Sequence, residues 1–109
     1  MSSPQYNKGY GAERELVKML REVPGFEDAT RNYADKVEGL GVDVTAGNML
    51  IQVKRYKGSV PISKYDEIKR DGGIKALVSK SNYKPWMITL SLDDFITIAN
   101  DVGALFGEP

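Results

Sequence analysis

Apolar side chains recur with the spacing of a helix in the first part of the chain. From about Lys8 to Val23 they fall three or four residues apart and form one stripe, made of Ala12, Leu16, Met19, Leu20 and Val23. Pro24-Gly25 is expected to end this helix. Residues 1–7 are a short polar segment and are predicted to be a flexible tail.

The pattern changes to the period of a strand in residues 41–57. Gly47-Asn48 suits the positive φ angles of a two-residue hairpin loop. This loop predicts a register in which Val44 faces Ile51 and Asp43 faces Gln52. The apolar members of the two predicted strands are mostly β-branched residues, which strands favour: Val42, Val44, Leu50, Ile51 and Val53.

The predicted register gives the hairpin a polar face and an apolar face. Lys54 lies two residues beyond Gln52 and therefore projects from the same face. Asp43, opposite Gln52, completes one polar cluster, because directly opposed side chains lie roughly 5 Å apart. The apolar residues expected to point to the other face, as core, are Val42, Val44, Ile51 and Val53.

The remaining elements are shorter. A strand is predicted at 26–33, a loop at 32–41, a short helix at 62–70 capped by Ser63, and strands at 74–80 and 86–92. Ser91 or Asp93 is expected to cap a last helix. The predicted order α-β-β-β-α-β-β-α indicates a single α/β domain over residues 1–109. Its 109 residues, of which 41% are hydrophobic, fit one modest core.

Composition excludes several kinds of chemistry. The chain has no cysteine and no histidine. It therefore has no disulfides, no thiolate or imidazole metal site and no Ser-His or Cys-His catalysis, and any metal must be held by oxygen. No apolar run is long enough to span a bilayer and no signal-peptide pattern is present, so we expect a cytoplasmic protein without a membrane partner.

The net charge is zero, but the charges are unevenly distributed. Residues 52–70 hold six basic side chains against Asp66 and Glu67. A basic sector of this kind can bind nucleic acid within a neutral protein, although charge runs are also common on ordinary solvated faces.

The polar cluster Asp43, Gln52 and Lys54 suits the hydrolysis of a phosphodiester. A carboxylate and an amide carbonyl are hard oxygen ligands that Mg²⁺ accepts. A lysine beside them can hold the attacking water and offset charge that develops on the phosphate. Glu13 is the preferred helix acid, since it lies about 60–70° from the centre of the apolar stripe and Glu15 lies further round. The alternative is a hairpin whose solvent face simply carries polar residues.

These residues resemble two related nuclease patterns. Asp43, eight residues and then Gln52-Val-Lys54 resemble the metal-site signature of the PD-(D/E)XK nuclease superfamily. The run Lys8-Gly-Tyr-Gly-Ala-Glu-Arg-Glu-Leu-Val17 is similar to the opening helix of archaeal-type Holliday junction resolvases. In that family an arginine matching Arg31 follows a Gly-Phe pair, here Gly25-Phe26, and Val42-Asp-Val-Thr-Ala-Gly47 is similar to the strand with the metal-binding aspartate. The resemblance covers residues 8 to about 57, and the remainder only by element order.

The resemblance implies a restriction-endonuclease-like fold, with a central mixed β-sheet flanked by helices, and a metal-dependent endonuclease. Mg²⁺, with Mn²⁺ as a substitute, would be held by Glu13, Asp43, Gln52 and the main-chain carbonyl of Val53. Lys54 would orient the water. The basic residues implied in contacts with DNA phosphates are Lys8, Arg14, Arg31, Arg55, Lys57 and Lys64.

A four-way junction is cut symmetrically on two strands, so the resolvase interpretation implies a homodimer. Five apolar residues near the C-terminus are the candidates for its interface, with a core position preferred for Ile88: Trp86, Met87, Ile88, Leu105 and Phe106.

Gln52 departs from the resolvase pattern, which has glutamate there, and Gln52 with Lys54-Arg55-Tyr56 is similar to the Mrr-type branch of restriction endonucleases. The loss of a carboxylate predicts weaker metal binding or a larger part for Glu13, with Glu27 and Glu38 as reserve candidates. Three functions stay open: a junction-resolving endonuclease, which we favour, an Mrr-like or repair-type nuclease on other DNA, and an inactive nucleic-acid-binding module. A small nuclease of this kind would fit a phage or an archaeon.

Overall fold

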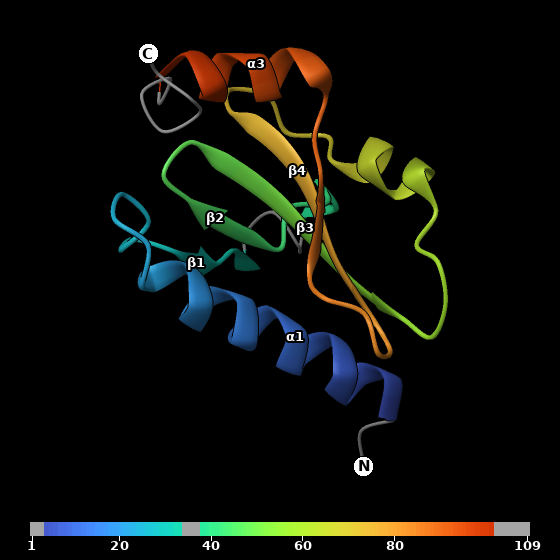
Figure 1. The fold of residues 1–109 in the computed structure, drawn as a ribbon. Helices are drawn as coiled ribbons and strands as arrows, with labels where there is room; N and C mark the ends of the chain where they lie inside the picture. Colours follow the sequence, from blue (N-terminus) through green and yellow to red (C-terminus); the bar gives the residue numbers. More distant parts are fainter. Residues whose placement is uncertain (1–3, 34–37, 102–109) are drawn as a thin grey trace.

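The computed structural model describes residues 4–33 and 38–101. They form an α/β fold in which a five-stranded mixed sheet is flanked by helices (Figure 1). This confirms the α/β class expected from the sequence. The elements are, in order, α1 (Pro4–Arg21), β1 (Thr30–Arg31), β2 (Val44–Ala46), β3 (Met49–Tyr56), the 3-10 helix η1 (Ile62–Glu67), β4 (Ile74–Ser81), β5 (Met87–Thr89) and α3 (Leu92–Asp101).

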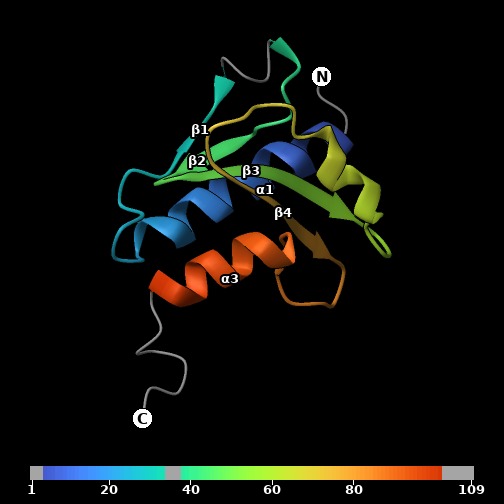
Figure 2. The same ribbon diagram turned by 90° about the horizontal axis from the view of Figure 1, so that it is seen from above.

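The sheet has the strand order β1-β2-β3-β4-β5. β3 and β4 are parallel, and the other neighbouring pairs are antiparallel. Because parallel strands need a crossover connection, the chain leaves β3, passes through η1 and returns to β4 beside it (Figure 2). Within the β2–β3 hairpin, the pair Val44↔Ile51 and the turn at Gly47-Asn48 confirm the predicted register.

The core is divided between the two faces of the sheet. On one face Leu16 and Val17 of α1 belong to the same buried cluster as Ile51 and Val53 of β3. On the other face Val42, Leu50 and Ile68 form a smaller cluster with Tyr65 of η1. Side chains alternate along a strand, so α1 covers the odd-numbered residues of β3 and η1 the even-numbered ones.

Val42 was expected on the same face as Val44, and this expectation is wrong. Val42 is fully buried, but it packs with Leu50 and Ile68 on the η1 side. The reason lies at Asp43, because the regular pairing of β2 with β3 stops at Val44. Beyond that point the Val53 N–H donates to the side-chain carboxylate of Asp43 and not to the main chain of Val42. The regular alternation is interrupted at that residue.

Two N-terminal boundaries also differ from the predictions. α1 begins at Pro4 and not near Lys8, so residues 4–7 belong to the helix, while residues 1–3 lie outside the described residues. Proline suits a first helical turn, where its fixed φ is already helical and no N–H partner is needed. The predicted strand at 26–33 shrinks to Thr30–Arg31, because the N–H groups of Phe26 and Ala29 bond within turns. Residues 34–37 of the predicted loop lie outside the described residues.

The predicted helix at 62–70 is the shorter η1, and Ser63 is not its cap. Pro61 occupies the N-cap position without a side-chain hydrogen bond. After Glu67 the chain is tied to the loop before β2, where the Lys69 N–H donates to the Leu40 carbonyl at 2.7 Å.

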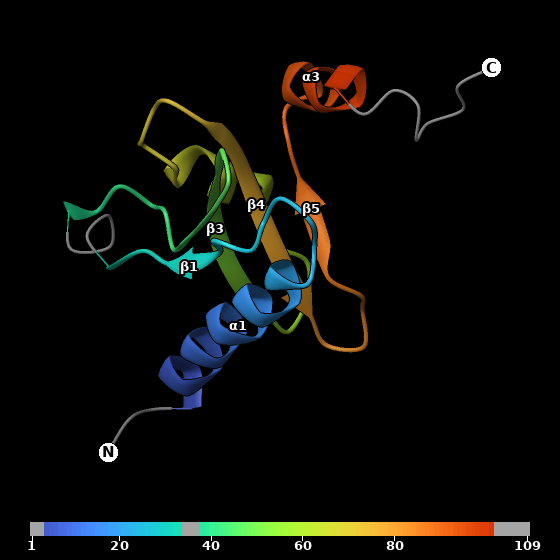
Figure 3. The ribbon, with the colours of Figure 1, turned by 90° about the vertical axis from the view of Figure 1, so that its left-hand side faces the viewer.

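α3 begins as predicted and ends the described chain. The Ser91 hydroxyl accepts a hydrogen bond of 3.0 Å from the Asp94 N–H, which confirms Ser91 as the cap. α3 buries none of its residues and lies beyond the end of β5, at the opposite end of the molecule from α1 (Figure 3). Across residues 4–33 and 38–101, the helices are all too short or too polar to traverse a bilayer.

Candidate active site

Gln52 stands at the centre of the candidate site, in the middle of β3. Its side chain is buried, with an exposed fraction of 3%. The amide Nε2 donates a hydrogen bond of 2.7 Å to Oε1 of Glu67. The amide Oε1 is buried and accepts no hydrogen bond from the described residues. An unsatisfied buried oxygen is unfavourable by about 1–3 kcal/mol, so this atom suits a water or a hard cation as its partner.

Glu67 joins this site from η1, although no sequence pattern singled it out as a site residue. Its Oε1 lies 3.5 Å from Nζ of Lys54, and its Oε2 lies 2.9 Å from Nζ of Lys64. The hydrogen bond from Lys64, followed by that from Gln52, lowers the pKa of Glu67 to about 2. The same ion pair raises the pKa of Lys64. A carboxylate that stays ionised thus holds Gln52 and Lys54 together on one face, as the strand period predicted for these two residues.

One signal in the sequence could have pointed to Glu67. Lys64 and Glu67 are three residues apart, a spacing that brings side chains together on a helical turn. Their contact with Gln52, however, depends on the crossover that places η1 over β3, and no local pattern reports that long-range packing. Gly41 shows how close the two segments are: a Cβ atom there would lie 2.0 Å from the carbonyl oxygen of Glu67.

Asp43 is fixed at the end of β2 by two hydrogen bonds to β3. Its N–H donates to the Ile51 carbonyl at 2.8 Å, and its Oδ2 accepts the Val53 N–H at 2.9 Å. The predicted direct pair with Gln52 is therefore replaced by a bond to the next residue, since the ladder ends at Val44. Val53 itself pairs with Val78 of β4.

Glu13 lies on the α1 side of the sheet and is buried. Its Oε1 is 3.4 Å from Nε of Arg31, and the two side chains are only 7% and 14% exposed. Gln52, in contrast, is held by Glu67 on the η1 side. Among the residues that the structure describes, no three acidic side chains are grouped so that they could hold a metal ion.

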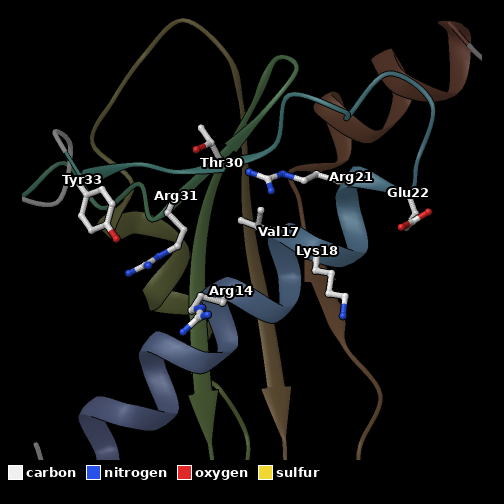
Figure 4. Close-up of a pocket in the computed structure, with 8 residues that line it drawn as sticks. All are labelled: Arg14, Val17, Lys18, Arg21, Glu22, Thr30, Arg31 and Tyr33. Carbon is white, nitrogen blue, oxygen red and sulfur yellow. The ribbon is translucent and has the colours of Figure 1, made fainter.

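The basic residues predicted to contact DNA are spread over several elements. Arg55 and Lys57 are exposed at and beyond the end of β3, and Lys64 is paired with Glu67. Arg14 and Arg31 line one pocket between α1 and β1 (Figure 4). Lys8 lies outside the residues whose side chains the structure describes.

Other candidates have structural or surface positions. Glu27 accepts a hydrogen bond of 2.9 Å from the Gly25 N–H and so supports a turn, and Glu38 is exposed. Met87 and Ile88 are 57% and 55% exposed, so the preferred core position of Ile88 is wrong. Trp86 packs against the α1-side core, and residues 105–106 lie outside the described residues.

Comparison of the chain with protein-family models found no match, and comparison with curated protein sequences found none either. The resemblance to PD-(D/E)XK nucleases therefore stays a prediction.

Proposed function

We propose that the protein is a metal-dependent, structure-selective DNA endonuclease of the Holliday junction resolvase type, built on a restriction-endonuclease-like fold. The observation that carries the proposal is the arrangement of β2 and β3. The carboxylate of Asp43 accepts a hydrogen bond from the main-chain N–H of Val53, the residue between Gln52 and Lys54. The side chains of Gln52 and Lys54 both contact Glu67 on one face of the sheet. A carboxylate, an amide oxygen and an ammonium group are groups that can hold a divalent cation and a water molecule in phosphodiester hydrolysis.

The residues present fit a divalent cation bound through oxygen. Gln52 contributes a buried amide oxygen without a partner in the described chain, and Asp43 contributes a carboxylate at the adjoining strand end. Both are hard ligands of the kind that Mg²⁺ prefers, with Mn²⁺ as a substitute. The main-chain carbonyl of Val53 is a further proposed ligand. Glu13, predicted as a ligand from the sequence, lies on the α1 side of the sheet, opposite the Gln52 amide, and is left out of this ligand set. The bound ion would supply Lewis-acid polarisation of the scissile phosphate.

Lys54 is the residue proposed to act on the water. Its Nζ lies 3.5 Å from Oε1 of Glu67, and this ion pair restricts its position. From there Lys54 would orient water for in-line attack and stabilise negative charge on the phosphate. Glu67 is a positioning residue in this scheme, because it acts through Gln52 and Lys54.

Phosphate contacts are proposed for the six basic residues selected from the sequence. Such contacts carry little sequence information, and their strength falls steeply with salt. Recognition would therefore depend on the shape and deformability of branched DNA. The residues proposed for these contacts are Lys8, Arg14, Arg31, Arg55, Lys57 and Lys64.

Paired cleavage of a junction requires two active sites, and we propose a homodimer that supplies them. Its interface would include the edge strand β5 and α3. Met87 and Leu92 are 57% and 70% exposed there, and exposed apolar surface of this kind is typical of an interaction site.

A second candidate is a nucleic-acid-binding module without catalytic activity. The specific observation in its favour is that the side chain at position 52 is an amide already bonded to Glu67, while the described residues contain no group of three acids suited to a metal.

Cleavage of DNA in Mg²⁺ or EDTA separates these two candidates. We expect the wild type to cut only with metal, and Asp43→Asn and Lys54→Ala to bind DNA but not to cut it. DNA binding by the wild type without cutting under either condition would establish the inactive module instead.

A further inference from the structure

An open pocket of ≈ 510 Å³ lies between α1 and β1, on the side of the sheet where Glu13 is buried (Figure 4). Val17 and Thr30 form part of its wall. Its charged lining consists of four basic side chains and one acidic side chain: Arg14, Lys18, Arg21, Arg31 and Glu22. A pocket of this charge and size is suited to a small anionic group.

Three of the basic side chains come from one face of α1. Arg14, Lys18 and Arg21 follow one another at four- and three-residue spacing, so they lie above one another on the helix surface. Like charges at this spacing destabilise a helix, and an anion bound between them would remove that repulsion. Arg21 is fixed at the pocket by a hydrogen bond of 2.8 Å from its Nε to the Ala29 carbonyl.

An aromatic ring stands at one end of the pocket. Tyr33 is 57% exposed, and the guanidinium carbon of Arg31 lies 4.8 Å from the centre of its ring. This cation–π contact orients the ring. An exposed aromatic side chain beside a basic groove is the arrangement on which unpaired bases stack in proteins that bind single strands.

We propose that this pocket holds an unpaired nucleotide of the DNA substrate, with its phosphate on Arg14, Lys18 and Arg21 and its base against Tyr33. The inference rests on the proposed function and gives it a means of substrate selection, because a base in intact duplex is stacked and must be extruded at an energetic cost. The ion pair of Arg31 with Glu13 places the pocket on the α1 side of the sheet, opposite the Gln52 amide and Glu67. The nucleotide would therefore be held apart from the bond that is cut.

Binding is measured in EDTA, so that no strand is cut, with two matched DNAs. One is a fully paired duplex, and the other carries a single unpaired 2-aminopurine nucleotide. We expect the wild type to bind the second DNA more tightly and to quench its fluorescence. Tyr33→Leu should weaken that binding by about tenfold and reduce the quenching, with unchanged affinity for the duplex, whereas Tyr33→Phe should retain both properties.

Charge is tested by a second pair of variants. Lys18→Glu should weaken binding of the DNA with the unpaired nucleotide more than Lys84→Glu, which makes the same charge change at an exposed residue of the β4–β5 loop, away from this pocket. The nucleotide-binding role of the pocket would be overturned if the two charge variants weakened binding equally. It would also be overturned if Tyr33→Leu weakened binding of both DNAs equally. Either result would leave the nuclease proposal intact. A wild type that binds neither DNA would overturn both.

Discussion

The amide of Gln52 and the carboxylate of Glu67 are joined by a 2.7 Å hydrogen bond that connects the centre of β3 to the crossover helix η1. The resolvase pattern that the sequence resembles has a glutamate at the position of Gln52. Here a carboxylate reaches the same neighbourhood from a different element. Glu67 therefore supplies, next to Gln52, the negative charge that the sequence pattern lacks, and several predictions depend on this pair.

Gln52→Glu should lower stability in the absence of metal, because it places a second carboxylate against Glu67 in place of a hydrogen-bond donor. We expect a loss of about 1–3 kcal/mol in the free energy of unfolding. The double variant Gln52→Glu/Glu67→Gln exchanges donor and acceptor and should recover most of it. Urea denaturation in EDTA gives the free energy of unfolding of both variants. Equal losses of this free energy in the single and double variants would show that the two side chains are not coupled.

Mg²⁺ provides an independent test of the same position. Gln52→Glu should bind Mg²⁺ more tightly than the wild type, since a carboxylate replaces a neutral amide oxygen. Titration calorimetry gives the affinity without reference to cleavage. If the metal affinity is the same in both proteins, position 52 is not a ligand.

Acid stability should depend on Glu67. The folded-state pKa of about 2 lies below the ordinary value of 4.5, so the ionised carboxylate stabilises the fold above pH 4.5 and this contribution is lost as the pH falls through about 2. The side chain is 43% exposed, so solvent screening keeps the effect below about 1 kcal/mol. The stability gap between wild type and Glu67→Gln should narrow across this range in denaturation curves. A gap independent of pH would contradict the assignment.

Gly41→Ala should displace η1 and disturb the site. Gly41 has φ +75°, and a Cβ atom there would lie 2.0 Å from the Glu67 carbonyl oxygen. Gly39 has a similar φ of +73°, but no atom lies within 4 Å of its Cβ position. Backbone strain of about 1–3 kcal/mol is therefore common to both alanine variants. Any further loss of unfolding free energy in Gly41→Ala measures the clash with the Glu67 carbonyl. Equal losses would contradict the close approach of the two segments.

Dimer formation should depend on the exposed apolar side chains of α3. Leu92→Lys should shift the protein towards monomer in sedimentation velocity without unfolding it. Ile62→Lys is the matched control, since Ile62 is similarly exposed at 74%, against 70% for Leu92, but lies on η1. A wild type that is monomeric at every concentration would contradict the dimer.

The parts of the fold that depend on local pattern could be predicted from the sequence. The β2–β3 register was predictable because Gly47-Asn48 sets the turn and the side-chain period is two. The position of Val42 was not, because the carboxylate of Asp43 takes the place of a main-chain acceptor. Glu67 was missed because its role depends on where the crossover packs, which is long-range information.

Metal-dependent junction cleavage is measured by incubating a synthetic four-way junction and the corresponding linear duplex with the protein in Mg²⁺ or in EDTA. Asp43→Asn serves as the control. We predict paired nicks at symmetric positions of the junction, only with metal and only with the wild type. Cutting of the duplex as readily as the junction would favour a general nuclease, and tight binding without any cutting would contradict the claim of catalysis.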